Sequence, residues 1–362
     1  MRKRDGLKRL SGAARTGTVV MLSAMIAQAS FLPTSGAATA KAPFSNNAEL
    51  TRNIRAFGNA LNQQGVVQLD SSLARSLATV RSDWQHLVAT SGKNCIGWHT
   101  QTNTNANPCT FGDSKSLKTV VLFGDSHAEQ WLGVLNDLAK SRHWKLVSLL
   151  RSSCGAAQSQ ATSVAIGVDQ PLCAKWRLHA LAYIRVLKPN MVVFSGSIGG
   201  VVDGTPNYTG REKALNQTLI SYVAGHVKSH VVSIADTMTA TYGVSPSRFD
   251  TATCLSRSAL KVTLNSPYMA SSAAGNPTGC YRTYNDVPSD KGVSIRTELI
   301  AADLSQGVIS INPAGWVCDT TSPNGICPPV IDGSVVYMDE THLTLTFTLR
   351  LRNLLGSRFP TL

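Results

Sequence analysis

From about residue 118, the chain alternates short, continuous apolar runs with longer stretches in which apolar residues recur every three or four positions. Short apolar runs are typical of buried strands, and the three-to-four spacing is typical of helices that pack on a core. Their alternation favours a mostly parallel sheet that is covered by helices on both faces. The predicted strands are 119–123, 144–150, 191–195, 231–235 and 308–311, and the predicted helices are 129–140, 173–187, 211–227 and 292–304.

Two further segments depart from this alternation. Residues 46–91 carry helical periodicity and predict a helical N-terminal extension over 41–92. Residues from about 238 to 287 interrupt the strand–helix pattern with Ser, Thr and Pro, and predict a surface insertion. We therefore expect a main domain over 93–362 that contains this insertion and follows the helical extension.

The amino end has the pattern of an export signal. Basic residues precede a mostly apolar run from Thr18 to Leu32, and the small residues Ala38-Thr39-Ala40 follow it. The apolar run is shorter than the roughly 20 residues that a spanning helix needs. This favours a cleaved signal peptide over 1–40, although the long basic flank also fits an uncleaved signal anchor. In both cases we expect a secreted or extracytoplasmic protein from about Lys41 onward.

The eight cysteines agree with an oxidising compartment, because an even number of them in an exported chain is typical of disulfide bonds. Their spacing favours local pairs. The expected pairs are Cys95 with Cys109, Cys154 with Cys173, Cys254 with Cys280, and Cys318 with Cys327. No C-x-x-C occurs and no histidine lies at ligand spacing from a cysteine, so we expect neither a metal site nor another cofactor.

The charge balance says less about partners than its total suggests. The formal net charge is +13, but residues 1–40 hold six basic residues and one acidic residue, which leaves 13 − 5, or +8, for residues 41–362. That surplus fits either an anionic partner such as a cell-wall polymer or an ordinary solvated surface. Basic and aromatic residues do not interleave as they do in nucleic-acid grooves, so we expect no nucleic-acid partner.

The first candidate for chemistry follows the predicted strand at 119–123. The strand ends at Gly124, and Asp125 and Ser126 open a helix. A serine at this junction lies at the rim of the sheet, where the free N–H groups of a helix start can stabilise an oxyanion. Gly-Asp-Ser also occurs in ordinary turns and caps, so the motif alone leaves both interpretations open. Neighbouring side chains usually point apart, and His127 is therefore interpreted as structural.

A serine nucleophile needs a general base and a group that orients the base. Asp339 and His342 supply both near the carboxyl end, since a spacing of three lets the two side chains share one turn. Asp83 and His86 repeat the spacing inside the helical extension and are interpreted as a solvated helix face. The other histidines, His99, His143, His179, His226 and His230, are interpreted as surface or hydrogen-bonded residues, and Asp236, which follows a predicted strand, as a turn residue.

Taken together, Gly124-Asp125-Ser126-His127-Ala128 and Asp339-Glu340-Thr341-His342-Leu343-Thr344 resemble the SGNH (GDSL-like) hydrolase superfamily. The resemblance is narrower to the SGNH domains that are associated with cell-surface polysaccharide acyltransferases, and it covers roughly residues 93–358. It implies a three-layer α/β/α sandwich with a central, mostly parallel sheet, here stapled by disulfides. It also implies that Ser126 is the nucleophile and that Asp339 and His342 complete the triad.

The resemblance further implies an oxyanion hole. In the family, its donors are the nucleophile's own N–H, a glycine N–H after the second strand, and an asparagine after the third. Ser126 and Gly155 match the first two positions. The third block reads Ser195-Gly196-Ser197 without an asparagine, so Gly196 and Ser197 are the replacements to test.

These observations predict an exported serine-dependent acyl-transfer enzyme, either an O-acetyltransferase or an acetylesterase. Its expected substrate is cell-envelope or extracellular carbohydrate, and its intermediate is an acyl-serine. The sequence contains no multi-span membrane region, so the acyl group is expected from solution or from a separate membrane acyltransferase. The alternative is a non-catalytic carbohydrate-binding or accessory protein on the same fold.

Overall fold

The structure is a computed structural model that describes residues 41–83, 95–98, 101–156, 170–197, 223, 229–237, 250–264, 279–284, 300, 304–305, 307–322 and 325–362. All of them belong to one folded unit over 41–362. The predicted signal segment over 1–40 lies outside the described residues, as do most of the helices predicted over 211–227 and 292–304.

Seven strands of the described chain form a central sheet in the order β10-β7-β6-β4-β5-β2, with β3 also paired to β5. Neighbouring strands are parallel except for β3 and β5, which are antiparallel. The strands are β2 (Ile96–Gly97), β3 (Cys109–Gly112), β4 (Thr119–Gly124), β5 (Lys145–Arg151), β6 (Met191–Ser195), β7 (His230–Ile234) and β10 (Ile309–Ile311). The five strands predicted for the parallel sheet are all present.

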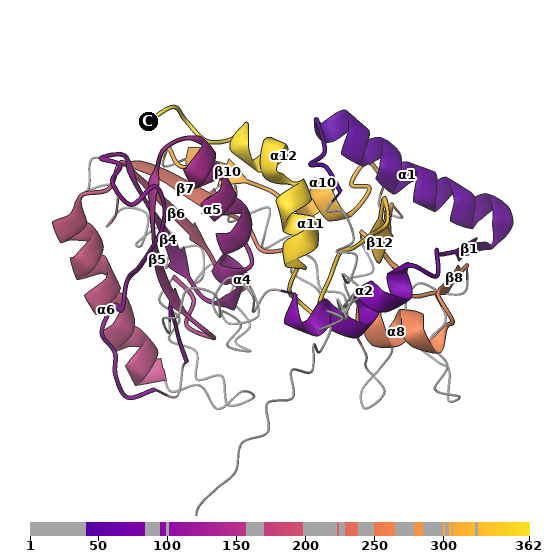
Figure 1. The fold of residues 1–362 in the computed structure, drawn as a ribbon, viewed down its shortest axis with the longest axis horizontal. Helices are drawn as coiled ribbons and strands as arrows, with labels where there is room; N and C mark the ends of the chain where they lie inside the picture. The colour runs from indigo at the N-terminus through magenta and orange to yellow at the C-terminus, as the bar shows by residue number, and fades with distance from the viewer. Residues whose placement is uncertain are drawn as a thin grey trace, which may run out of the picture. The chain divides into compact units, whose positions relative to one another are not determined.

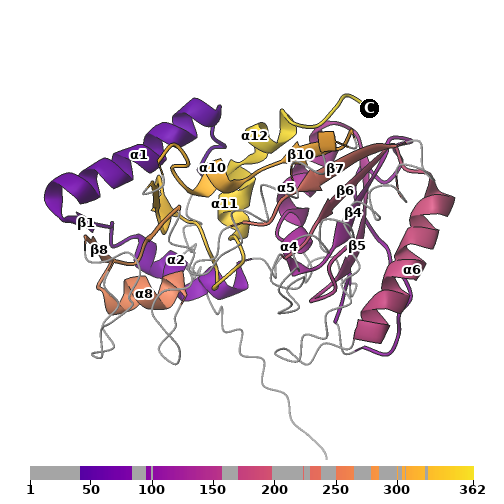
Figure 2. The same cartoon turned by 180° about the vertical axis from the view of Figure 1, so that it is seen from behind.

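Helices cover both faces of this sheet (Figures 1 and 2). Leu122 and Leu146 belong to a hydrophobic cluster with residues of α4 (Ser126–Glu129) and α5 (Leu132–Ser141). Phe123 points to the opposite face and packs on Trp176 of α6 (Gln170–Leu187), with the ring centroids 5.4 Å apart. Successive residues of a buried strand point to opposite faces, which explains why these strands are continuously apolar. The α/β/α layers confirm the predicted fold class.

A second region combines the N-terminal extension with segments that follow β7. It contains α1 (Asn47–Gln64), β1 (Val66–Gln68), α2 (Leu73–Thr79), α8 (Thr251–Arg257), β8 (Lys261–Thr263), β9 (Arg282–Thr283), α10 (Ala314–Val317), β11 (Ile326–Cys327), β12 (Val330–Ile331) and β13 (Ser334–Val335). Helix α1 begins at an Asn46 cap, ends at Gly65 with φ 68°, and buries one face.

The segment predicted as a surface insertion contributes buried side chains to this region. Strand β8 pairs antiparallel with β1 of the extension. Leu255 of α8 and Val262 of β8 are fully buried in the same cluster as Leu50 of α1. The expectation of a surface position therefore does not hold for the described part, because the insertion and the extension cover each other's apolar faces.

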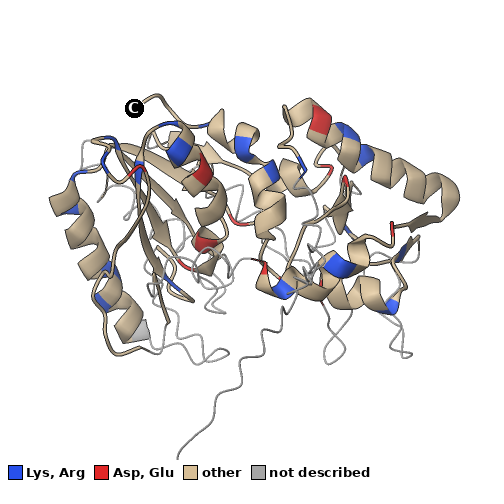
Figure 3. Ribbon diagram, in the orientation of Figure 1, with Lys and Arg blue, Asp and Glu red and all other residues tan. Residues whose placement is uncertain are grey.

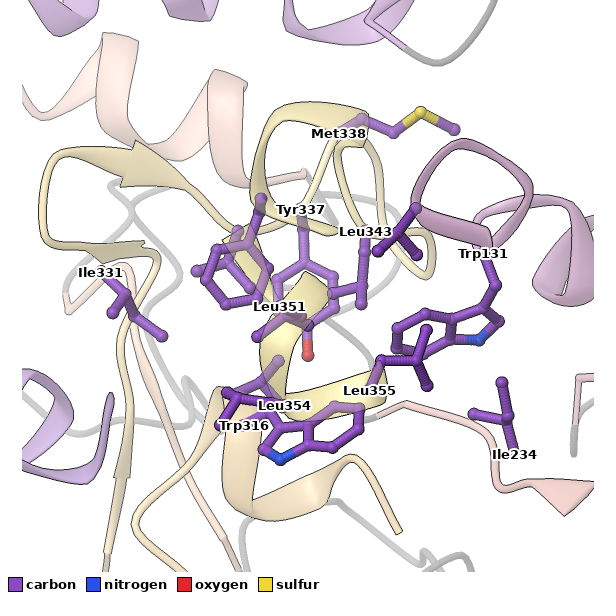
Figure 4. Packing of buried hydrophobic residues seen from close by; sticks show 14 of the residues in the cluster. Trp131, Ile234, Trp316, Ile331, Tyr337, Met338, Leu343, Leu351, Leu354 and Leu355 are labelled. Atoms are coloured by element: carbon purple, nitrogen blue, oxygen red, sulfur yellow. The ribbon is translucent and has the colours of Figure 1, made fainter. Parts of the chain in front are cut away.

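The carboxyl-terminal stretch forms two short helices, α11 (Leu345–Arg350) and α12 (Arg352–Gly356). They pack with α5 and join a cluster that holds Trp131, Trp316 and Leu355 (Figure 4). The ring centroids of Trp131 and Trp316 lie 6.2 Å apart, edge to face. The two helices thus hold the end of the chain against the sheet-covering layer that begins beside Ser126.

Four disulfides join Cys95 to Cys109, Cys154 to Cys173, Cys254 to Cys280, and Cys318 to Cys327. These are the pairs that the sequence spacing favours. Cys95–Cys109 ties the short strand β2 to β3 along the same edge of β5. Cys154–Cys173 ties the loop after β5 to α6. Both disulfides therefore fix segments at the end of the sheet that carries Ser126.

Basic residues are distributed over several elements. Figure 3 shows Lys and Arg on α1, α5, α6 and α12 among others, with no run of them along one element. In the described chain, no helix is both long enough and apolar enough to cross a membrane.

Candidate active site

Strand β4 ends at a glycine because no other residue fits there. Gly124 has φ 154°, and a Cβ added to it would lie 2.0 Å from the carbonyl oxygen of Ser195 in β6. Asp125 follows as the N-cap of α4, and its side chain accepts a hydrogen bond of 2.8 Å from the N–H of His127. Ser126 is consequently the first residue of α4, at the carboxyl end of the parallel strands.

Asp125 also joins the ends of three strands. Its Oδ2 accepts a hydrogen bond of 2.9 Å from the N–H of Ser197 after β6. The same oxygen is 3.6 Å from the ideal Cβ position of Gly155 after β5, and 3.4 Å from that of Gly196. A Cβ at either glycine would therefore lie in van der Waals contact with this carboxylate. The acid of the Gly-Asp-Ser block therefore organises the rim around Ser126.

Two segments 216 positions apart meet at the candidate nucleophile. The Ser126 hydroxyl lies 2.8 Å from Nε2 of His342, and Nδ1 of His342 lies 2.8 Å from Oδ2 of Asp339. The neutral tautomer of His342 with its proton on Nδ1 satisfies both contacts, since Ser126 then donates to Nε2 and Nδ1–H donates to Asp339. This is the geometry that a Ser-His-Asp triad requires.

Asp339 holds the turn as well as the imidazole. Its Oδ1 accepts hydrogen bonds of 2.8 Å from the N–H groups of both Thr341 and His342. Partial burial raises the pKa of Asp339, but these bonds and the contact with His342 outweigh it and hold the pKa below its ordinary value. The carboxylate is therefore ionised at neutral pH and available to stabilise an imidazolium.

Gln130 docks this turn onto the serine segment. Its Oε1 accepts a hydrogen bond of 2.8 Å from the N–H of Leu343. It lies at the break between α4 and α5, where Trp131 N–H bonds to Ala128 O in a tight turn. The helix predicted over 129–140 is split at this point. Leu343 itself is fully buried near Trp131 (Figure 4).

A pocket of about 210 Å³ opens beside the serine. Trp98 lies at this pocket with 53% of its surface exposed. The strand β2, which ends at Gly97, and the Cys95–Cys109 disulfide hold it there. The residues that line the pocket are Trp98, Ser126, Gln130, Ser152, Ser153, Met338, Asp339 and His342.

Residues 94–356 match the family model that is described as SGNH domain (fused to AT3 domains). The chain belongs to the SGNH family. Membership in this family supports an acyl-transfer or ester-hydrolysing role. In fold, this SGNH domain is similar to the periplasmic domain of a lipopolysaccharide acetyltransferase from Salmonella ser. Paratyphi A, with a TM-score of 0.54 and 14% identity over 78% of this chain and 98% of that chain. Among curated proteins, no sequence matches the chain significantly.

The N–H groups that the family resemblance suggests for an oxyanion hole differ in whether they are free to donate a hydrogen bond. Within the described chain, the N–H groups of Ser126 and Gly155 have no hydrogen-bond acceptor. The Gly155 loop is held from behind, because buried Arg177 donates a bond of 3.2 Å from Nη1 to the Gly155 carbonyl oxygen. The N–H of Ser197 is already donated to Asp125, so it cannot also serve an oxyanion in this arrangement.

A second histidine–aspartate pair lies next to the contacts of Ser126, His342 and Asp339. Nδ1 of His127 is 2.5 Å from Oδ1 of Asp236, and both side chains are buried. The ring of His127 lies 4.5 Å from that of His342, centroid to centroid. Ser126 and His127 both face this site because successive residues in a helix are only about 100° apart. Asp236, expected as a turn residue, is instead the partner of His127.

Charge–charge contacts decide the protonation of His127. Burial alone would lower its pKa, but Asp236, together with Asp125 and Asp339, raises it to about 9. Glu129, one turn from Ser126, contrasts with it: burial, assisted by the charge of Asp125, raises the pKa of this carboxyl well above its ordinary value. The contact with Asp236 therefore favours the protonated form of His127, whereas burial favours the neutral form of Glu129.

The remaining acidic and histidine residues from the sequence lie elsewhere. Asp83 accepts bonds from the N–H and hydroxyl of Thr346 at the start of α11, and His86 falls outside the described residues. His143, His179 and His230 are exposed, whereas His99 and His226 are not described. No group of three or more His, Cys, Asp or Glu side chains in the described ranges is arranged to hold a metal ion.

The sequence reasoning missed Gln130, Trp98 and the role of Asp236. Gln130 is a polar residue at the start of an otherwise apolar helical pattern, which was the available signal for a side chain with a specific partner. Trp98 stands beside a loop rich in Asn and Thr, where a large aromatic residue has no predicted core to join. Nothing in the sequence links Asp236 to His127, since 109 positions separate them.

Proposed function

We propose that this protein is an exported, serine-dependent acyl-transfer enzyme, an O-acetyltransferase or acetylesterase, that acts on cell-envelope or extracellular carbohydrate. The observation that carries the proposal is the continuous chain of contacts from Ser126 Oγ to His342 and Asp339 at the wall of an open pocket. Such a chain activates a hydroxyl that is otherwise a weak nucleophile at neutral pH.

The reaction follows from this geometry. His342 takes the Ser126 proton while Oγ attacks the carbonyl carbon of an acyl ester, and the oxyanion forms near the N–H groups of Ser126 and Gly155. His342 then returns the proton to the departing alkoxide, and acyl-Ser126 remains. Water or a sugar hydroxyl, deprotonated by His342, attacks the carbonyl carbon of this ester. The bond between that carbon and Ser126 Oγ breaks, His342 returns the proton to Oγ, and an acid or an acylated sugar leaves. Asp339 orients the imidazole and stabilises its charged form in both halves.

Three observations support the location and partners in this proposal. The four disulfides are typical of an oxidising, extracytoplasmic compartment. The similar Salmonella domain is described as periplasmic and as part of a lipopolysaccharide acetyltransferase. The family description refers to domains fused to AT3 domains, which supports a separate membrane acyltransferase as the source of the acyl group for this chain.

Replacement of the nucleophile tests the enzyme proposal. Ser126→Ala should lower the hydrolysis of p-nitrophenyl acetate by at least about 10³-fold, because the covalent route is lost. Ser141→Ala, on the exposed surface of α5, is the matched control and should retain full activity. A serine-directed phosphonate should label the wild type and not Ser126→Ala. An active wild type that loses nothing in Ser126→Ala would refute Ser126 as nucleophile, and an unlabelled, inactive wild type would favour the carbohydrate-binding alternative.

The exposed indole of Trp98 supports a carbohydrate at the pocket, because aromatic faces pack on the apolar faces of sugar rings. Trp98→Ala should reduce kcat/KM for an acetylated oligosaccharide by about 3- to 10-fold, the size of a lost aromatic contact. It should leave p-nitrophenyl acetate hydrolysis nearly unchanged, since that ester has no sugar. Trp98→Phe should recover most of the loss. An equal fall on both substrates would indicate damage to the pocket and not a sugar contact.

A further inference from the structure

The proposed reaction does not use His127 or Asp236, yet these two residues form a fully enclosed pair next to the triad. Their side chains are only 5% and 7% exposed. Burying two ionisable groups costs free energy unless they are paired and hydrogen-bonded. The pair also sits at the junction of two elements that carry the site, the start of α4 and the end of β7. This position suits a role beyond packing.

Asp236 is well placed to hold His127 still. It follows β7, an inner strand of the sheet paired on both sides, and its Oδ1 also accepts a bond of 2.8 Å from the N–H of Thr237. The backbone N–H of His127 is fixed in turn by Asp125, at 2.8 Å. The imidazole of His127 consequently presents a rigid surface to its neighbour.

That neighbour is His342. The two rings are tilted by 50° with centroids 4.5 Å apart, so His127 limits how far the His342 ring can turn from the line between Ser126 and Asp339. Among the described residues, the ionisable groups near the two rings include Asp125 from the serine segment, Asp236 after β7 and Asp339 from the turn before α11, and Glu129 lies in the same helix as His127. Three of these carboxyl groups act on His127 as negative charges.

We propose that His127 and Asp236 are a positioning pair that holds the ring of His342 in line with Ser126 and sets the pH range in which His342 works as a base. The pair rests on the proposed function, since it acts through His342. The cation on His127 offsets one of the three nearby negative charges. Without it, the carboxylates would favour a protonated His342, which cannot accept the Ser126 proton.

Variants that change the charge of the pair distinguish this role from packing. His127→Gln removes a positive charge and leaves Asp236, so the acidic limb of the kcat/KM profile for p-nitrophenyl acetate should move to higher pH by about one unit. His127→Gln with Asp236→Asn removes both charges and should bring the limb back toward that of the wild type. Asp236→Asn alone removes the charge that keeps His127 protonated, so the pair stays neutral overall and the limb should move less than in His127→Gln.

A matched control comes from an exposed pair of the same residues. Nδ1 of His143 lies 3.5 Å from Oδ2 of Asp113, and the His143 side chain is 83% exposed. His143→Gln and Asp113→Asn should leave both the rate and the pH profile unchanged. All profiles are measured on the full-length chain, with thermal unfolding recorded for each variant.

A readout that needs no activity comes from ¹⁵N NMR of the histidine rings in the wild type. At pH 7, His127 should show both ring nitrogens protonated, and this signature should disappear in His127→Gln but not in His143→Gln. A neutral His127 would overturn the proposal even if a variant failed to fold. So would superimposable pH profiles of the wild type and His127→Gln, or a shift in the double variant that equals the shift in His127→Gln.

These outcomes are separable from failure of the enzyme proposal. If the wild type hydrolyses the ester and Ser126→Ala does not, the triad stands. An unshifted limb in His127→Gln then refutes the positioning pair alone. If Ser126→Ala remains as active as the wild type, the enzyme proposal fails first, and the positioning pair fails with it.

Discussion

The protein contains two histidine–aspartate pairs within contact of each other, and they differ in almost every respect except chemistry. Asp339 and His342 come from one turn, and their side chains are 39% and 19% exposed. His127 and Asp236 come from different elements and are 5% and 7% exposed. The first pair contacts the Ser126 hydroxyl and the pocket, whereas the second contacts only protein.

The contrast shows that the surroundings of an imidazole decide what it can do. A general base must change its charge during each turnover, so it needs access to the substrate and a carboxylate that tolerates both states. A buried ion pair resists such a change, because losing one charge leaves the other without compensation in a medium of low polarity. Asp339 and His342 are therefore suited to proton transfer, and His127 and Asp236 are suited to fixed positioning.

Substituting the two aspartates in parallel gives the sharpest test of this contrast. Asp339→Asn should reduce kcat/KM for p-nitrophenyl acetate by about 10³- to 10⁴-fold, because an amide favours the wrong tautomer of His342 and cannot stabilise its charge. Asp236→Asn should cost about tenfold or less, because His342 keeps its own carboxylate.

Steady-state kinetics at one pH above the acidic limb measures this difference, with Asp113→Asn as the exposed control. Losses of similar size for Asp339→Asn and Asp236→Asn would abolish the distinction between the two pairs. A larger loss for Asp236→Asn would reverse it, and would make the enclosed pair the one that takes part in proton transfer.

The two pairs also differ in what the sequence reveals of them. Asp339 and His342 are three positions apart, so local spacing alone predicts that they share a turn. The parallel strands could also be predicted from the sequence, because each is a continuous apolar run such as Val120 to Phe123. The positions of Gly124 and Ser126 are predicted in the same way, since an apolar run that ends at a glycine indicates a junction between a strand and a helix.

Contacts that depend on the order of the strands in the sheet could not be predicted from the sequence. Asp236 meets His127 only because β7 and β4 lie on either side of β6 in the sheet, an order that periodicity does not specify. The burial of the described part of the insertion was not predicted, for a related reason. Its apolar residues are few and scattered, and they form a core only after β8 pairs with β1 of the distant extension. Side-chain bonds such as that of Gln130 to Leu343 add a further layer beyond sequence pattern.

Alkaline unfolding sharpens the comparison at the level of stability, where the expected effect is smallest. The pKa of His127 is raised to about 9 from an ordinary 6.5, so its protonated form stabilises the fold. A raised pKa means that this contribution is complete below about pH 6.5 and is lost as the pH rises through about 9, and its upper limit is about 3 kcal/mol. The variant with His127→Gln and Asp236→Asn lacks both charges and should lose no stability from this source. Urea unfolding between pH 6 and pH 10 should therefore give a wild-type free energy of unfolding that falls toward the curve of the double variant. Parallel curves for the wild type and the double variant over that range would mean that His127 binds its proton no more tightly in the folded protein than in the unfolded one.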